Sequence, residues 1–93
     1  MESDRVREIR RRLTGALAPS LLEIEDRSAL HAGHAGAKEQ GGGHFVVTIR
    51  SAAFRGKTAI ERSRMVHAAL REMMPGQIHA LSIRAVDEEE QRG

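Results

Sequence analysis

Three of the five histidines in this chain, His31, His34 and His79, are candidates for chemistry. His31, His34 and His44 fall within the sixteen residues LHAGHAGAKEQGGGHF, and His79 lies in the segment IHALSI. Imidazole binds zinc, copper, nickel and iron, so His31 and His34, three residues apart in a glycine-rich loop, could reach one ion. A closed structural site needs about four ligands, and two histidines are too few for one. The pattern therefore raises metal binding as a hypothesis without establishing it.

His79 and the loop histidines each leave two interpretations open. His79 is expected in phase with Leu81 and Ile83 on a strand, either as a partly buried residue that hydrogen-bonds backbone or as a ligand held on a rigid element. The loop is about 15 residues long, and such long connections tend to be functional or disordered. Its glycines predict high mobility, and those at 41–43 are interpreted as a flexible spacer. His44 and His67 are expected at a strand end and on a helix surface.

The composition limits which classes of site and protein are possible. The chain has no cysteine, so it cannot itself provide the thiolates of the usual zinc or iron–sulfur site. Its 93 residues predict a single domain, 1–93, with a core at about 4–86 and an acidic flexible tail at 87–93. No apolar run approaches the roughly 18 residues of a membrane span, and charges occupy the place of a secretory signal's apolar stretch. We therefore expect a cytoplasmic protein with no membrane association.

The first half of the chain predicts one helix and two strands. Apolar residues at helical spacing predict a helix over residues 4–17, capped by Ser3 and followed by Pro19. LLEIED, at 21–26, predicts a short strand. HFVVTIRS, at 44–51, predicts a second strand that pairs with the first as a long-looped hairpin, with Phe45, Val47 and Ile49 on one face.

The second half predicts a helix and a last strand. Thr58 to Glu61 form a T-x-x-E capping box, which begins a helix over about 59–74 that Pro75 ends. IHALSIRAV, at 78–86, predicts the third strand. The order α-β-β-α-β predicts an α+β fold in which two helices pack on one face of a three-stranded mixed sheet.

The sequence contains no visible catalytic constellation. The serines lack an evident His–Asp partnership, acidic residues fall on expected helix surfaces and the tail, and no phosphate-binding glycine motif occurs. We therefore expect no enzymatic activity.

The basic stretch FRGKTAIERSRMVHAAL suggests a possible nucleic-acid interface. Its Arg55, Lys57, Arg62 and Arg64 could neutralise phosphates, in a chain whose formal net charge is only +2. The alternative is a solvated basic face that balances the acidic tail. The near absence of aromatic residues also removes a base-stacking platform.

Four segments in this order and spacing, LHAGHAGA, HFVVTIRSAAF-x-GK, ERSRMVHAAL and IHALSI, resemble the BolA family over about residues 5–86. The resemblance implies a fold similar to a class II KH domain and no enzymatic activity. It also implies a heterodimer with a monothiol glutaredoxin that holds a [2Fe–2S] cluster for iron–sulfur cluster delivery or iron regulation. Glutaredoxin and glutathione would provide the thiolates. This chain would provide the imidazoles of His79 and of a loop histidine. His31 matches the usual loop position better than His34. The chain alone is expected to be a monomer without a cluster.

The resemblance also implies an alternative function. Some family members resemble DNA-binding transcriptional regulators of stress and cell shape, through a helix-turn-helix-like stretch that corresponds to residues 54–70. This chain departs from the pattern there, because Ser63 stands where R-H-R is typical and His67 replaces a common tyrosine. Ala29 replaces a histidine that many loop-histidine members have. None of these departures affects His79.

Overall fold

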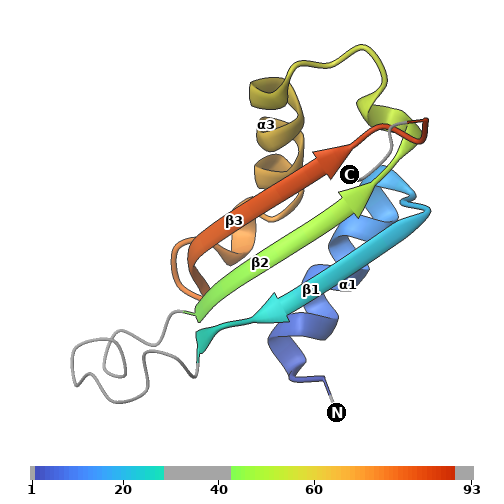
Figure 1. Ribbon diagram of the computed structural model, residues 1–93. Helices are drawn as coiled ribbons and strands as arrows, with labels where there is room; N and C mark the ends of the chain where they lie inside the picture. The colour runs from blue at the N-terminus through green and yellow to red at the C-terminus, as the bar shows by residue number, and fades with distance from the viewer. Residues whose placement is uncertain (1, 29–42, 90–93) are drawn as a thin grey trace.

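The computed structural model describes residues 2–28 and 43–89. Its elements are α1 (Asp4–Leu17), β1 (Leu21–Asp26), β2 (Gly43–Arg50), the 3-10 turn η2 (Ala52–Phe54), α3 (Ala59–Ala69), the 3-10 turn η3 (Arg71–Met73) and β3 (Ile78–Val86) (Figure 1). This order confirms the predicted α-β-β-α-β chain. The second helix ends earlier than predicted, and Met74 is already extended because it precedes Pro75.

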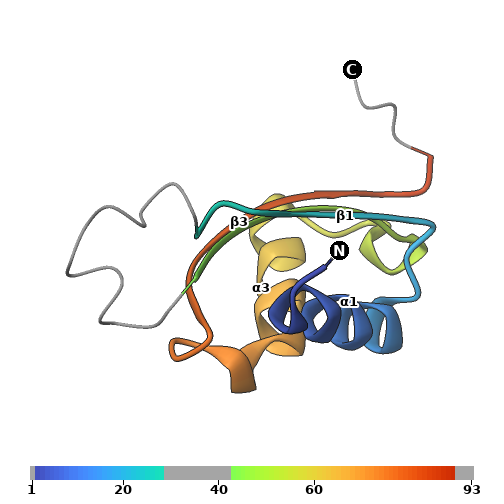
Figure 2. The ribbon, with the colours of Figure 1, turned by 90° about the horizontal axis from the view of Figure 1, so that it is seen from below.

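The three strands form a mixed sheet in the order β1-β2-β3. β1 is antiparallel to β2, and β3 is parallel to β2. Both helices lie against the same face of the sheet, and the described residues leave its other face open (Figure 2). The predicted two-layer α+β architecture is therefore confirmed. Within the described part of the chain, no helix is both long and apolar enough to cross a membrane.

The core lies between the sheet and the two helices. On β2, Phe45, Val47 and Ile49 are fully buried and alternate with half-buried residues, as period-two patterning predicts. The helices bury Leu13 and Val66 against this face. Burying each such side chain contributes about 1.5–3 kcal/mol relative to an exposed position. The three buried side chains of β2 therefore contribute strongly to the packing of both helices on the sheet.

Both helices begin at the capping residues that the sequence predicts. The Ser3 Oγ accepts a hydrogen bond from the backbone N–H of Val6 at 3.2 Å. At α3, the Glu61 N–H donates to Thr58 Oγ1 at 3.1 Å, and the Thr58 N–H donates to Glu61 Oε1 at 2.8 Å. The backbone hydrogen bond from Thr58 lowers the pKa of Glu61, because it stabilises the ionised carboxylate. The capping box therefore fixes where α3 starts.

An ion-pair network joins α1 to η3. Arg12 contacts Glu8 at 2.6 Å and Glu72 at 3.1 Å. Hydrogen bonds from Arg11, and after it from Arg12, lower the pKa of Glu8 to about 2. The carboxylate is therefore charged at neutral pH, and Arg12 links the first helix to the turn that leads into β3.

Gly43 packs too tightly to act as a spacer. A Cβ atom at this position would lie 2.6 Å from Phe45 Cε2 and 2.6 Å from Ser28 Oγ. Phe45 is fully buried and has no free space into which to move. The interpretation of residues 41–43 as a flexible spacer is therefore wrong at Gly43, which is the first residue of β2. Residues 41 and 42 lie outside the described part of the chain.

Ser51 fastens the other end of β2. Its side chain is 1% exposed, and its Oγ donates a hydrogen bond to the carbonyl of Leu17 at 2.5 Å. The same oxygen accepts from the backbone N–H of Ala53 at 3.0 Å. One hydroxyl therefore forms hydrogen bonds with the carbonyl of the last residue of α1 and with a backbone N–H at the start of η2.

We predict that Gly43→Ala lowers the free energy of unfolding by about 1–3 kcal/mol, because the added methyl group overpacks the site against Phe45. Gly76→Ala is the matched control, since no atom lies within 4 Å of its added Cβ. It should change the free energy of unfolding by less than about 0.5 kcal/mol. Urea unfolding followed by far-ultraviolet circular dichroism measures both. Equal effects of the two substitutions would show that Gly43 is not sterically constrained.

We predict that Ser51→Ala lowers the free energy of unfolding by about 1–3 kcal/mol, because it leaves the Leu17 carbonyl and the Ala53 N–H unpaired. Ser82→Ala removes the same hydroxyl from an exposed position on β3 and should stay within about 0.5 kcal/mol of the parent. Thermal and urea unfolding provide the comparison. A loss at Ser82 as large as at Ser51 would contradict the anchoring role.

Candidate functional site

His79 is the second residue of β3 and is exposed. Ile78 pairs with Gly43 and Ala80 pairs with His44, so His79 is an extra residue at an irregularity of the bulge type. Ile78 is fully buried, which interrupts the alternation along the strand. The prediction that His79 shares a face with Leu81 is therefore wrong, because the bulge shifts the phase between these two residues.

The backbone immediately before His79 is held in place. The Gly43 N–H donates to the Gln77 carbonyl at 3.2 Å, and the Gln77 N–H donates to the Met73 carbonyl at 2.8 Å. Ile78 anchors the strand in the core. Within the described residues, the His79 imidazole makes no hydrogen bond. Of the two interpretations that the sequence left open, the partly buried, internally bonded histidine does not fit, and an available imidazole on a fixed strand does.

The ends of the long β1–β2 connection lie at the same end of the sheet as His79 (Figure 1). Asp26 pairs with Phe45, and Gly43 lies beside Ile78. The Ser28 Oγ accepts from the His44 N–H at 3.1 Å, which ties the end of β1 to the start of β2. His31 and His34, and the expected loop mobility, lie outside the described residues. Chain connectivity therefore starts and ends the histidine-bearing segment close to His79.

The described residues do not assemble a complete metal site. No group of three or more His, Cys, Asp or Glu side chains with metal-binding geometry occurs among them. His44, predicted at a strand end, is the second residue of β2 and half-buried, and His67 is half-buried near the end of α3. A metal group at His79 would therefore need further ligands from outside residues 2–28 and 43–89.

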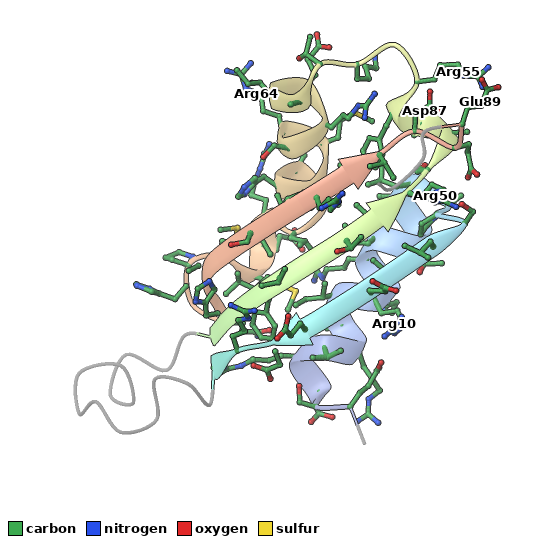
Figure 3. All side chains as sticks on the ribbon, in the orientation of Figure 1. Arg10, Arg50, Arg55, Arg64, Asp87 and Glu89 are labelled. Atoms are coloured by element: carbon green, nitrogen blue, oxygen red, sulfur yellow. The ribbon has the colours of Figure 1, made fainter. Side chains whose placement is uncertain are left out.

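The four predicted phosphate-binding side chains do not form one open surface. Arg62 donates to the Lys57 carbonyl at 2.9 Å and to the Ala85 carbonyl at 3.2 Å, which joins α3 to the connector and to β3. Arg55 pairs with Asp87 and Glu89, well away from Arg64 (Figure 3). Lys57 and Arg64 are exposed. The folded chain thus presents a smaller basic surface than its sequence suggests.

The helix-turn-helix-like interpretation of residues 54–70 also changes. This stretch contains the end of η2, a connector and α3, so it holds one α-helix and not two.

The described residues also show a hollow of about 480 Å³ between α1 and η3, which is lined in part by the paired side chains Glu8, Arg12 and Glu72. None of the candidate histidines or basic residues lines it.

Comparison with protein families identifies a match to most of this chain. The family model described as BolA-like protein matches residues 13–90. Among curated proteins, BolA-like protein 1 of Mus musculus is 42% identical over 77 residues, which is 83% of this chain and 53% of that protein. SufE-like protein 1, chloroplastic/mitochondrial, of Arabidopsis thaliana is 40% identical over 79 residues, 81% of this chain and 21% of that protein. The chain thus spans about half the length of its BolA-like protein 1 relatives.

Solved structures agree with the sequence comparison. The BolA domain of SufE1 from Arabidopsis thaliana superimposes with a TM-score of 0.83 at 36% identity, covering 98% of this chain and 100% of that domain. The solution structure of BolA1 from Mus musculus gives a TM-score of 0.75 at 37% identity, covering 94% and 68% of the two chains. The family model, the relatives and the fold lead to one conclusion: this chain belongs to the BolA-like family.

Proposed function

We propose that this chain is a non-enzymatic partner of a monothiol glutaredoxin and that the two proteins together hold a [2Fe–2S] cluster for iron–sulfur cluster delivery or iron regulation. The observation that carries the proposal is the exposed imidazole of His79, which makes no hydrogen bond to any of the described residues and lies at the start of β3. His79 is the main ligand from this chain. His31 is the loop ligand, with His34 as the second choice.

The ligand chemistry of the chain favours a shared cluster over a self-contained one. A [2Fe–2S] cluster takes four ligands besides its own sulfides, usually thiolates, and histidine can replace cysteine on one iron. The chain has no cysteine, so its contribution is limited to imidazoles. The remaining ligands are thiolates, one from glutaredoxin and one from glutathione. Replacing thiolate by neutral imidazole raises the reduction potential of such a cluster.

The relatives give independent support for an iron–sulfur role. A BolA domain forms part of a SufE-like protein, and that domain matches 98% of this chain in structure. The SufE-like name relates this kind of domain to iron–sulfur chemistry. The chain covers about half of its BolA-like protein 1 relatives, so their partners and activities come to this chain only as part of the proposal.

DNA binding by residues 54–70 receives less support as the main function. Arg62 is committed to two backbone carbonyls, and Arg55 to two carboxylates. Of the four predicted contacts, only Lys57 and Arg64 are exposed and have no such contact within residues 2–28 and 43–89.

The proposal is tested by cluster reconstitution. The chain is mixed with a monothiol glutaredoxin, glutathione, iron and sulfide, and the visible circular dichroism spectrum is recorded. We expect a spectrum that differs from that of the glutaredoxin homodimer. His79→Ala should abolish the new spectrum, because it removes the ligand on the rigid strand, and His31→Ala should weaken it. The chain alone should stay colourless, since it provides no thiolate.

His67→Ala is the matched control, because it removes the same side chain from α3. It should leave the heterodimer spectrum unchanged. Far-ultraviolet spectra of all variants report whether each one is folded. A mixture whose spectrum equals that of glutaredoxin alone, or a stable coloured cluster on this chain without its partner, would refute the proposal.

A further inference from the structure

Arg50 and Arg84 lie on the face of the sheet that neither α1 nor α3 covers (Figure 2). Arg50 is the last residue of β2 and follows Ile49, whose side chain is buried towards the helices (Figure 3). Arg84 lies on β3 directly opposite Thr48. Because residues two positions apart on a strand share a face, Arg50, Thr48 and Arg84 all lie on the open face.

The pairing of β2 with β3 brings the two arginines close together. Arg50 pairs with Val86, and Arg84 lies two residues before Val86 on the same strand. The two arginines are therefore diagonal neighbours, whose Cα atoms are about 7–8 Å apart. Long side chains can reach across such a separation, so one ligand can contact both guanidinium groups.

The Arg50 side chain has a donor that the fold leaves without a partner. Its Nε is buried and accepts no bonding partner, and its guanidinium forms no ion pair within the part of the chain that the structure describes. A buried, unpaired donor is costly and generally indicates a bound water, ion or ligand. Arg64, Arg71 and Arg84 also have no partner among the described residues, but they are exposed to water. Arg50 therefore differs from them, because its Nε has neither water nor protein to bind.

The neighbouring charges favour a carboxylate over a dense polyanion. Glu23 and Glu25 lie on β1 and on the same face of the sheet. Asp87 follows β3 and is already paired with Arg55. These carboxylates repel a ligand that carries many closely spaced phosphates. A single carboxylate can instead form two parallel hydrogen bonds with one guanidinium.

The position of the two arginines favours a ligand that belongs to another protein. Neither arginine lines the hollow between α1 and η3, and small ligands bind mainly in hollows. Side chains on one side of an extended peptide are about 6.6 Å apart, which is close to the separation of Arg50 and Arg84. An extended peptide with acidic residues at alternate positions therefore places one carboxylate at each guanidinium.

We propose that the open face of the sheet is a docking surface for an acidic peptide of a partner protein, and that Arg50 and Arg84 each bind one of two carboxylates at alternate positions of that peptide. The half-buried Arg50 side chain turns towards the carboxylate, and the contact gives Nε its missing partner. A second copy of this chain fits less well. The two-fold arrangement that pairs Glu23 with Arg84 also brings the two Arg50 side chains together.

The experiment compares two fluorescein-labelled peptides of equal composition by fluorescence anisotropy at low ionic strength. The spaced peptide is Ser-Thr-Glu-Thr-Glu-Thr-Ser, and the adjacent peptide is Ser-Thr-Glu-Glu-Thr-Thr-Ser. We expect the spaced peptide to bind about threefold to tenfold more tightly, because adjacent side chains of an extended peptide point to opposite sides.

Substitution of either arginine tests the assignment of the two contacts. Arg50→Gln and Arg84→Gln should each weaken binding of the spaced peptide about threefold to tenfold. Arg50→Lys should restore only part of the loss, because an ammonium cannot form the bidentate contact. Nitrogen-15 NMR of the arginine side chains is the second readout. The Arg50 Nε–H signal should shift when the spaced peptide is added, since this donor gains a partner.

Arg71→Gln is the matched control, because it removes the same charge from an exposed position on η3, on the helix side of the sheet (Figure 2). It should change the affinity for the spaced peptide by less than about twofold. Urea unfolding of each variant shows whether it is folded. Because Arg84 is exposed, Arg84→Gln keeps the test available if Arg50→Gln does not fold.

Three results would overturn the proposal. Equal affinities for the two peptides, or an equal loss with Arg71→Gln, would mean that only net charge matters. An Arg50 Nε–H signal that does not respond to the bound peptide would place the peptide elsewhere. A dimer in sedimentation velocity that is lost with Arg84→Gln, without peptide binding, would mean that a second copy covers this face. The mixture contains no glutaredoxin, iron or sulfide, so failure here is distinguishable from failure of the proposed function.

Discussion

The structure depends on the burial of one face of β2. The two helices cover only one face of the three-stranded sheet. The central strand must therefore direct its apolar side chains to that face. Phe45, Val47 and Ile49 meet this requirement with no exposed surface. A shift of one residue in register would turn all three to the open face, so the register of β2 sets that of both neighbours. Gly43 adds a steric limit at its first position.

The two ends of β2 have different chemistry as a result. At its start, the pairing of Gly43 with the buried Ile78 leaves His79 as an extra, exposed residue on β3. At its other end, Ser51 and its contact with Val86 bring the connector and the residues after β3 together. The pairing of β2 with β3 therefore leaves an exposed imidazole at one end of the sheet and brings a charged contact to the other.

Two arginine side chains donate hydrogen bonds to backbone carbonyls of the sheet. Arg10 donates to the Leu22 carbonyl at 3.4 Å, and Arg62 donates to the Ala85 carbonyl at 3.2 Å. Leu22 and Ala85 lie on the two edge strands, whose outward carbonyls would otherwise be open to another strand. A guanidinium has several donors and a long apolar stem, so it can reach an edge carbonyl from a helix. Basic residues that a sequence pattern suggests as phosphate-binding residues can thus be hydrogen-bonded to backbone carbonyls within the fold.

The sequence by itself determined the elements, their order and their caps, because these depend on local periodicity and on residues three or four positions apart. The helix over 4–17, the Thr58–Glu61 capping box and the buried face of β2 are all of this kind. It also marked His79, but the bulge that exposes this residue arises from pairing between β2 and β3. Only the tertiary structure decided that Gly43 packs against Phe45 and Ser28, that Arg62 donates to the Ala85 carbonyl of β3, and that Arg55 pairs with Asp87. Each of these contacts joins residues from elements that are separate in the sequence, and local patterns carry no information about such distances.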